Sequence, residues 1–99
     1  MSTHLLQQIQ PLQDLDIGTI FKILNNCKKP YNIIIMKNDH YKLNESTFTG
    51  YIGFLLRKGL ITHIVKIVEY KRVSHYVITD KGMEILEQIE SLYNMLREW

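Results

Sequence analysis

The sequence has few of the residues that cross-link a chain, anchor it in a membrane or keep it disordered. Its one cysteine, Cys27, excludes an intrachain disulfide and a Cys-x-x-Cys metal site. Two prolines and five glycines in 99 residues exclude fibrous and low-complexity proteins. The longest apolar runs, such as residues 33–36, are far shorter than the roughly 20 residues of a membrane span. We therefore expect one globular domain without a signal peptide, in a reducing, cytoplasmic compartment.

Charge is unevenly distributed along this chain. Residues 1–16 hold two acids and no lysine or arginine, residues 17–79 carry a net +7, and residues 80–99 carry a net −3. A basic middle between acidic ends predicts one surface for a polyanion and another that is kept away from it.

Hydrophobic spacing predicts helices in the first half of the chain. Residues 3–9 have helical spacing, which Pro11 interrupts. A second helix begins at Asp14 or Asp16 and ends near residues 25–26. Periodicity does not separate a buried strand from a short helix in residues 31–37. We interpret them as a short helix because a turn-rich stretch, residues 38–40, and then another helix come directly after them.

A third helical pattern covers residues 45–58. Asn44 is a good N-cap, and Gly59 is a fitting residue just past the end. At 100° per residue, the inward positions are Phe48, Tyr51, Ile52 and Leu55.

The remaining residues predict a hairpin and a closing helix. Residues 61–69 and 75–79 alternate as strands, with the polar, basic segment 70–74 as the tip between them. Thr79 then caps a helix over residues 80–99. Three helices, a two-stranded hairpin wing and a long final helix make an α+β, winged helix-turn-helix layout.

Two stretches resemble winged helix-turn-helix regulators. Residues 46–61, STFTGYIGFLLRKGLI, are similar to the recognition helix of these proteins, with a polar start, an apolar spine and the ending L-x-x-x-G-L-I. Residues 76–86, YVITDKGMEIL, are similar to their strand-to-helix junction, Y-x-L-T-x-x-G-x-x-x-L. The two stretches occur in the family's order and together frame residues 16–99.

The resemblance implies binding of double-stranded DNA as a homodimer and a role in transcription regulation. The short chain and long last helix resemble most closely the small archaeal regulators, cellular or viral, which are similar to the MarR-type group. Residues 32–39, NIIIMKND, depart from the family pattern because they are more apolar than its usual second helix. The expected organisation is an N-terminal dimerisation segment (1–13), a DNA-binding core (14–79) and a C-terminal dimerisation helix (80–99) within one domain.

Residues on the outward face of segment 45–58 are the candidates for DNA contact. Two glycines on an outward helix face permit close approach to another surface, although tolerated surface glycines or packing against a loop are the alternative. Hydroxyl side chains in the first turns can reach bases or phosphates, and cations at the far end can reach phosphates or only favour the helix end. The recognition-helix candidates are Ser46, Thr47, Thr49, Gly50, Gly53, Arg57 and Lys58.

The wing and the turns supply further candidates. The wing candidates are Lys71, Arg72 and Ser74, for which a solvated charged turn is the alternative, and the other phosphate candidates are Lys28, Lys29 and Lys42. Tyr41 and Tyr70 are candidates either for hydrogen bonds to phosphate or for packing.

Apolar residues near both chain ends predict the dimer contact. The last helix continues its apolar spacing beyond what a small core can cover, and exposed apolar strips usually mark an interface. The dimer candidates are Leu5, Leu6, Ile9, Leu92, Met95, Leu96 and Trp99, and intramolecular packing of the first segment against the last is the alternative.

No catalytic or metal-binding pattern is found. The four histidines are scattered, and only His63 and His75 are candidates to face each other across the hairpin. We expect no enzyme, no cofactor, no metal and no membrane partner. Two alternatives to a regulator stay open: a winged helix that binds only proteins, against which the +7 block argues, and a chromatin-like binder of low specificity. A ligand-sensing regulator has no support in the sequence.

Overall fold

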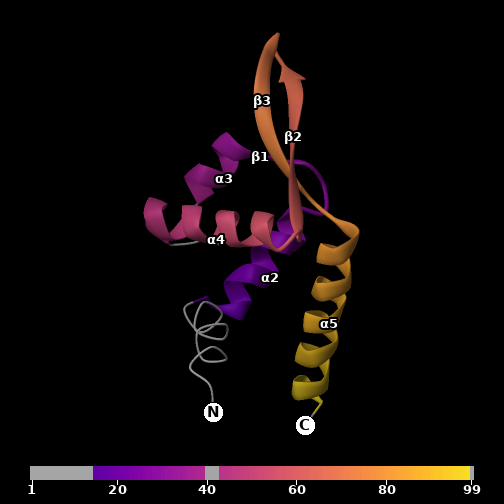
Figure 1. Ribbon diagram of the computed structural model, residues 1–99. Coiled ribbons are helices and arrows are strands. Elements are labelled where there is room, and N and C mark those ends of the chain that lie inside the picture. Colours follow the sequence, from indigo (N-terminus) through magenta and orange to yellow (C-terminus); the bar gives the residue numbers. More distant parts are fainter. Residues whose placement is uncertain (1–14, 40–42, 99) are drawn as a thin grey trace, which may run out of the picture.

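The computed structural model describes residues 15–39 and 43–98. The elements, in chain order, are α2 (Ile17–Asn26), β1 (Tyr31–Asn32), α3 (Ile33–Asp39), α4 (Glu45–Arg57), β2 (Ile61–Val68), β3 (Lys71–Ile78) and α5 (Asp80–Arg97). They form the α+β winged-helix architecture expected from the sequence (Figure 1). The predictions for residues 3–9 lie outside the described residues.

Three polar side chains start the helices where the sequence predicts. Asp16, Asn44 and Thr79 each accept a hydrogen bond from the backbone N–H three residues further on. Such caps satisfy donors that the first helical turn leaves free. At the other end of α4, Gly59 has φ +71, the left-handed conformation that glycine adopts most easily after a helix.

The core lies where α2, α3 and α4 meet the base of the sheet. Its buried apolar residues are Ile20, Ile23, Leu24, Cys27, Met36, Phe48, Tyr51, Ile52, Phe54, Leu55, Leu60, Ile61 and Leu86. The inward positions predicted for α4 are confirmed, and Phe54 is buried as well. The phenol oxygen of Tyr51 accepts a hydrogen bond from the backbone nitrogen of Asp16 at 2.7 Å, which joins α4 to the start of α2.

The sheet has three antiparallel strands in the order β1-β3-β2. The sequence predicts only a hairpin, because β1 is two residues long and pairs with residues far along the chain, Tyr31 with Tyr76 and Asn32 with His75. The short helix expected in residues 31–37 is confirmed as α3, but it starts after this strand.

The predicted wing tip is wrong in its extent. Strand β3 already begins at Lys71, so Lys71, Arg72 and Ser74 lie in the strand and the turn consists of Glu69 and Tyr70 alone. Both turn residues have positive φ, 50° and 68°. Residues 70–74 are mostly polar and basic, so they do not show the apolar–polar alternation that predicts a strand. Neither turn residue is the glycine or asparagine that usually marks such a turn.

The junction between β3 and α5 is closely packed. The Thr79 hydroxyl donates to the Gly59 carbonyl, and the Thr79 backbone nitrogen donates to the Leu60 carbonyl at 3.0 Å. A Cβ on Gly82 would collide with that same Leu60 oxygen. The Thr and Gly of the family-like junction therefore fasten the start of α5 to the turn that follows α4.

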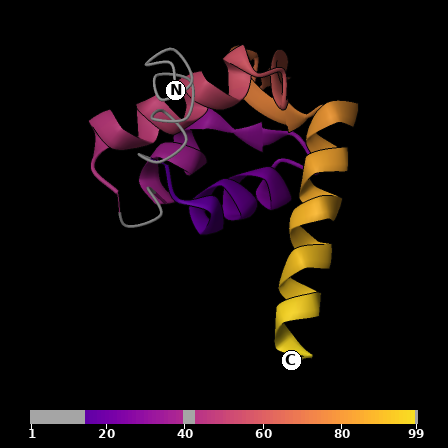
Figure 2. The same cartoon turned by 60° about the horizontal axis from the view of Figure 1, so that its bottom comes forward.

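The wing and the C-terminal end of α5 lie at opposite ends of the molecule (Figure 1). The ribbon of β2 and β3 rises above the helices (Figure 1), while the second half of α5 extends beyond α2, α3 and α4 (Figure 2). None of the helices in the described ranges is long and apolar enough to span a membrane.

Candidate nucleic-acid interface

The outward face of α4 is a stripe of small and hydroxyl-bearing residues. Ser46, Gly50, Gly53 and Arg57 recur every three or four residues, which places them on one side of the helix, opposite Phe48 and its buried neighbours. Ser46, Gly50 and Arg57 are exposed and Gly53 is half-buried. The candidates Thr47 and Thr49 are exposed beside the stripe.

The two glycines of the stripe pack against no neighbouring loop. At Gly50, no atom outside its own helical backbone and chain neighbours lies within 4 Å of where a Cβ would stand, in the part of the chain that the structure describes. At Gly53 the near atom is Nη1 of Arg57 at 3.1 Å, the mobile end of a side chain on the same helix. Among the residues that the structure describes, no loop packs against these glycines, so such packing does not account for them there.

The C-terminal end of α4 carries two exposed cations. Arg57 is in the last turn and Lys58 is the C-cap, where positive charge favours the helix dipole. The Lys58 ammonium lies 5.9 Å from the centre of the Phe54 ring. Both cations lie at the end of α4 that leads into β2.

The upper wing is a two-stranded ribbon with exposed cations on both faces. Residues opposite one another in antiparallel strands share a face, so Ile67 and Arg72 lie on one face, and Val68 and Lys71 on the other. Lys66 is also exposed in β2, although it is not among the wing candidates predicted from the sequence. Side chains alternate between the two faces of a strand, and this alternation could have indicated from the sequence that Lys66 is exposed on the wing.

Ser74 has an intramolecular partner. Its hydroxyl lies 2.8 Å from Nε2 of His63, and Ser74 is half-buried. The ring of His63 also packs on Tyr76, its partner across the strands, at 5.6 Å between centroids.

The two histidines do not face each other as expected. His63 is opposite Tyr76, whereas His75 is opposite Ile64 and so lies on the other face of the sheet. His75 is buried, and its Nδ1 lies 3.0 Å from the carbonyl oxygen of Val73. In the described ranges, 15–39 and 43–98, no group of three or more histidine, cysteine or acidic residues is arranged to hold a metal ion.

The lysines that follow α2 are not part of the stripe on α4. Lys28 Nζ is 3.9 Å from Glu90 Oε1, so this lysine pairs with the acidic helix α5. Lys29 is exposed, and Lys42 lies outside the described residues.

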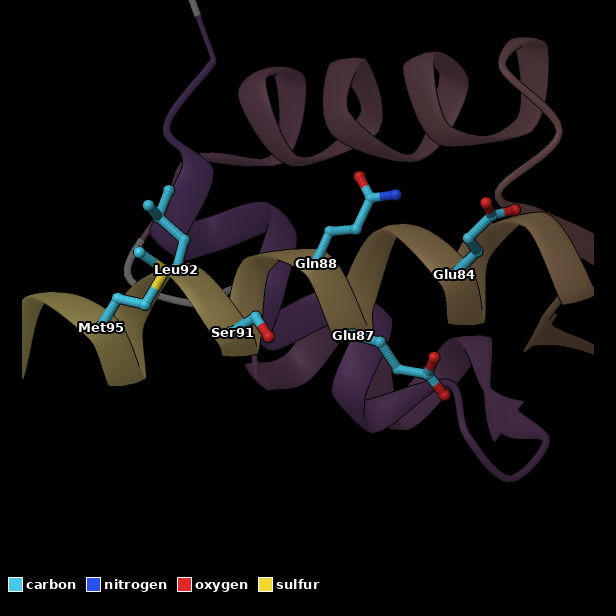
Figure 3. A pocket seen from close by; sticks show the side chains of 6 residues that line it. All are labelled: Glu84, Glu87, Gln88, Ser91, Leu92 and Met95. Atoms are coloured by element: carbon cyan, nitrogen blue, oxygen red, sulfur yellow. The ribbon is translucent and has the colours of Figure 1, made fainter.

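The far end of α5 exposes three of the predicted dimer residues. Leu92, Met95 and Leu96 are 53%, 56% and 58% exposed. An open hollow of about 500 Å³ runs along this side of the helix, where Glu84, Gln88 and Leu92 stand in a row (Figure 3). Its wall is acidic at the start of the helix and apolar at the end. Leu5, Leu6, Ile9 and Trp99 lie outside the described residues.

Cys27 is buried at the C-cap of α2. Removal from water raises the pKa of its thiol to about 12. The neutral thiol is therefore a core group at ordinary pH and not a nucleophile.

The chain matches the protein family described as winged helix-turn-helix over residues 15–97. No curated protein matches it. Solved structures with a similar fold include a PadR family transcriptional regulator from Eggerthella lenta, 17% identical with a TM-score of 0.64, where the match covers 95% of this chain and 86% of that one. A PadR-like transcription factor from Bacteroides fragilis is 16% identical with a TM-score of 0.66, over 96% and 93% of the two chains.

A PadR-like transcriptional regulator from Bacillus cereus is 19% identical with a TM-score of 0.61, over 97% of this chain and 91% of that one. At these identities the likeness to solved structures concerns the fold. The narrower resemblance to the MarR-type group and to archaeal or viral proteins stays a prediction.

Proposed function

The chain belongs to the winged helix-turn-helix family, and on that premise we propose that it regulates transcription by binding double-stranded DNA as a homodimer. In this proposal the outward face of α4 enters the major groove and the wing follows the phosphate backbone or the adjacent minor groove. The open space around Gly50 carries the proposal. A glycine inside a helix costs about 1 kcal/mol relative to alanine, and nothing within the described protein requires it at this position.

A smooth stripe on α4 suits close approach to a groove wall. The major groove is about 12 Å wide and admits a helix, and the first turns of a recognition helix commonly touch base edges. Ser46, Thr47 and Thr49 lie in those turns and are exposed. Arg57 and Lys58 at the other end are placed to contact phosphate.

The wing supplies the electrostatic part of binding. Lys71 and Arg72 are exposed, and neither makes an ion pair with another residue of the described ranges. Each cation that neutralises a phosphate releases a counterion, which adds affinity that falls with salt. Ser74, held by His63, contributes shape to the wing and at most a secondary contact.

The same stripe supports modest base specificity. Apart from Arg57 and the C-cap Lys58, the exposed α4 side chains described above are short, and bidentate readout of bases uses long polar side chains. This observation favours a weakly specific, chromatin-like mode as the second candidate. The ratio of specific to non-specific affinity separates the two modes.

Dimerisation through the far end of α5 completes the proposal. The exposed Leu92, Met95 and Leu96 form an apolar strip on an acidic helix, at the opposite end of the molecule from the basic wing (Figure 1). A twofold dimer would present two recognition helices to half-sites about 34 Å apart, or a multiple of that spacing. Sedimentation equilibrium tests this step: the wild type should be a dimer and Leu92→Asp/Leu96→Asp a folded monomer, and a monomeric wild type would contradict it.

Binding to random duplex DNA at a series of salt concentrations tests the function itself. For the wild type, the logarithm of the binding constant should fall with the logarithm of salt at about 0.9 per phosphate contacted. Lys71→Ala/Arg72→Ala should flatten that slope by roughly 1 to 2 per wing engaged. Lys28→Ala is the matched control, since Lys28 is paired with Glu90 and should leave the slope nearly unchanged. Absence of binding at low salt would overturn the proposal and favour a protein partner for the basic face.

A further inference from the structure

The tip of the wing carries an aromatic residue in an unusual conformation. Tyr70 has φ 68° and its side chain is fully exposed. Two-residue turns with both φ values positive are normally built from asparagine and glycine, because a side chain such as tyrosine is strained there. Packing does not account for Tyr70, since the ring touches no other part of the described protein.

The ribbon beneath the tip is also apolar and unsupported. Strand β1 pairs with Tyr76 and His75, so among the described strands none pairs with the ribbon over residues 65–74 as a third strand. Along it, Ile67 is 68% exposed and Val65 is 53% exposed. Water-facing apolar side chains on a projecting ribbon indicate that the ribbon meets another surface.

The charges along the hairpin indicate what kind of surface the ribbon contacts. Three cations, Lys66, Lys71 and Arg72, stand against one acid, Glu69, along the hairpin. A polyanion with an apolar interior fits this combination, and duplex DNA has both: phosphates along the edges of the minor groove and, behind the polar base edges at its floor, the stacked base pairs. Proteins that bind this groove often insert an apolar side chain between two base pairs and bend the duplex.

We propose that Tyr70 is a wedge that enters the minor groove and partly unstacks a base step, while Lys71 and Arg72 hold the flanking phosphates. The proposal rests on the DNA binding proposed above and adds the residue through which the wing reads DNA. A flexible pyrimidine–purine step costs least to open, so the wedge supplies a preference for such steps that the short side chains of α4 do not.

The Tyr70→Gly variant separates the wedge from the turn. Glycine suits φ 68°, so the variant should unfold at a higher temperature than the wild type. Its affinity for a 24-base-pair A·T-rich duplex should nevertheless fall by roughly tenfold or more, as loss of an aromatic stack on bases does. Tyr70→Phe keeps the ring and should keep the affinity.

Bending gives a readout that a purely structural role would not change. A duplex labelled at both ends should show increased energy transfer when saturated with the wild type or with Tyr70→Phe, and not with Tyr70→Gly. Equal affinity and equal bending by wild type and Tyr70→Gly would overturn the wedge, as would a Tyr70→Phe variant as weak as Tyr70→Gly. The function proposed above would still stand in that case, because it fails only if the wild type binds no duplex at low salt.

Discussion

Gly82 and Gly50 both lie inside helices, and their surroundings are opposite. A Cβ on Gly82 would collide with the Leu60 carbonyl oxygen, whereas one on Gly50 would meet no neighbouring element within 4 Å in the described part of the chain. The start of α5 is a closed region whose glycine is required by its own fold. The outward face of α4 is an open region, where no described neighbour requires a glycine.

Gly82→Ala should break the closed region and have the largest effect. The added methyl group collides with backbone, which cannot rotate away as a side chain can, and with Ile78 Cγ1 at 2.6 Å. Overpacking of this kind costs about 1–3 kcal/mol, and we expect the upper end of that range. Urea denaturation measures the loss, with Ser91→Ala on the exposed side of α5 as the control. A change below about 0.5 kcal/mol, the scale of ordinary surface substitutions, would show that the junction is not closed.

Alkaline pH should destabilise the protein through ionisation of the Cys27 thiol. Cys27 is connected to the closed region, because its carbonyl oxygen accepts a hydrogen bond from the Ile78 N–H at 2.8 Å. Burial raises the pKa of Cys27 from 9.0 to about 12, so the folded state holds the thiol proton more tightly than the unfolded state does. This contribution is complete below pH 9.0 and is lost as the pH rises towards 12, at about 1.4 kcal/mol per unit.

The difference between wild type and Cys27→Ala isolates this thiol from the titration of lysines and tyrosines. Between pH 8 and roughly pH 10.5, the free energy of unfolding of the wild type should fall more steeply than that of the variant. Parallel curves for the two proteins would contradict the burial of the thiol.

The same contrast explains how much the sequence could predict. Helix starts at Asp16, Asn44 and Thr79 were predictable because a cap is a local event, decided within about four residues. Strand β1 was not, since two residues that pair with Tyr76 and His75 have no local pattern. The wing tip was misplaced because Glu69 and Tyr70 adopt positive φ without the glycine or asparagine that announces such a turn.

The outward face of α4 was predictable for a different reason. Helical periodicity alone separates Ser46, Gly50, Gly53 and Arg57 from the buried Phe48 side, and the structure places them as the spacing requires. The spacing could not show the surroundings of each glycine. Only the folded structure distinguishes Gly82, which lies against backbone, from Gly50, which has no described neighbour within 4 Å of its Cβ position.

Gly50→Ala tests the other side of the comparison between the two glycines, and we expect it to change the stability least. The alanine fills open space on an exposed helix face, so the free energy of unfolding should rise by about 1 kcal/mol through helix propensity. Ser91→Ala on α5 is the matched control, a substitution by alanine at an exposed helix position that is neither a proposed DNA contact nor one of the proposed dimer residues. A loss of stability in Gly50→Ala would mean that the face of α4 is not open.

The affinity of Gly50→Ala for duplex DNA, measured with its stability on the same preparation, tests the central claim most directly. If the face of α4 lies against a groove wall, the variant is more stable than the wild type and binds duplex DNA more weakly, by roughly fivefold or more, the scale of about 1 kcal/mol. Ser91→Ala should bind as the wild type does. A Gly50→Ala protein that is more stable and binds DNA as tightly as the wild type would contradict the claim that this face meets DNA.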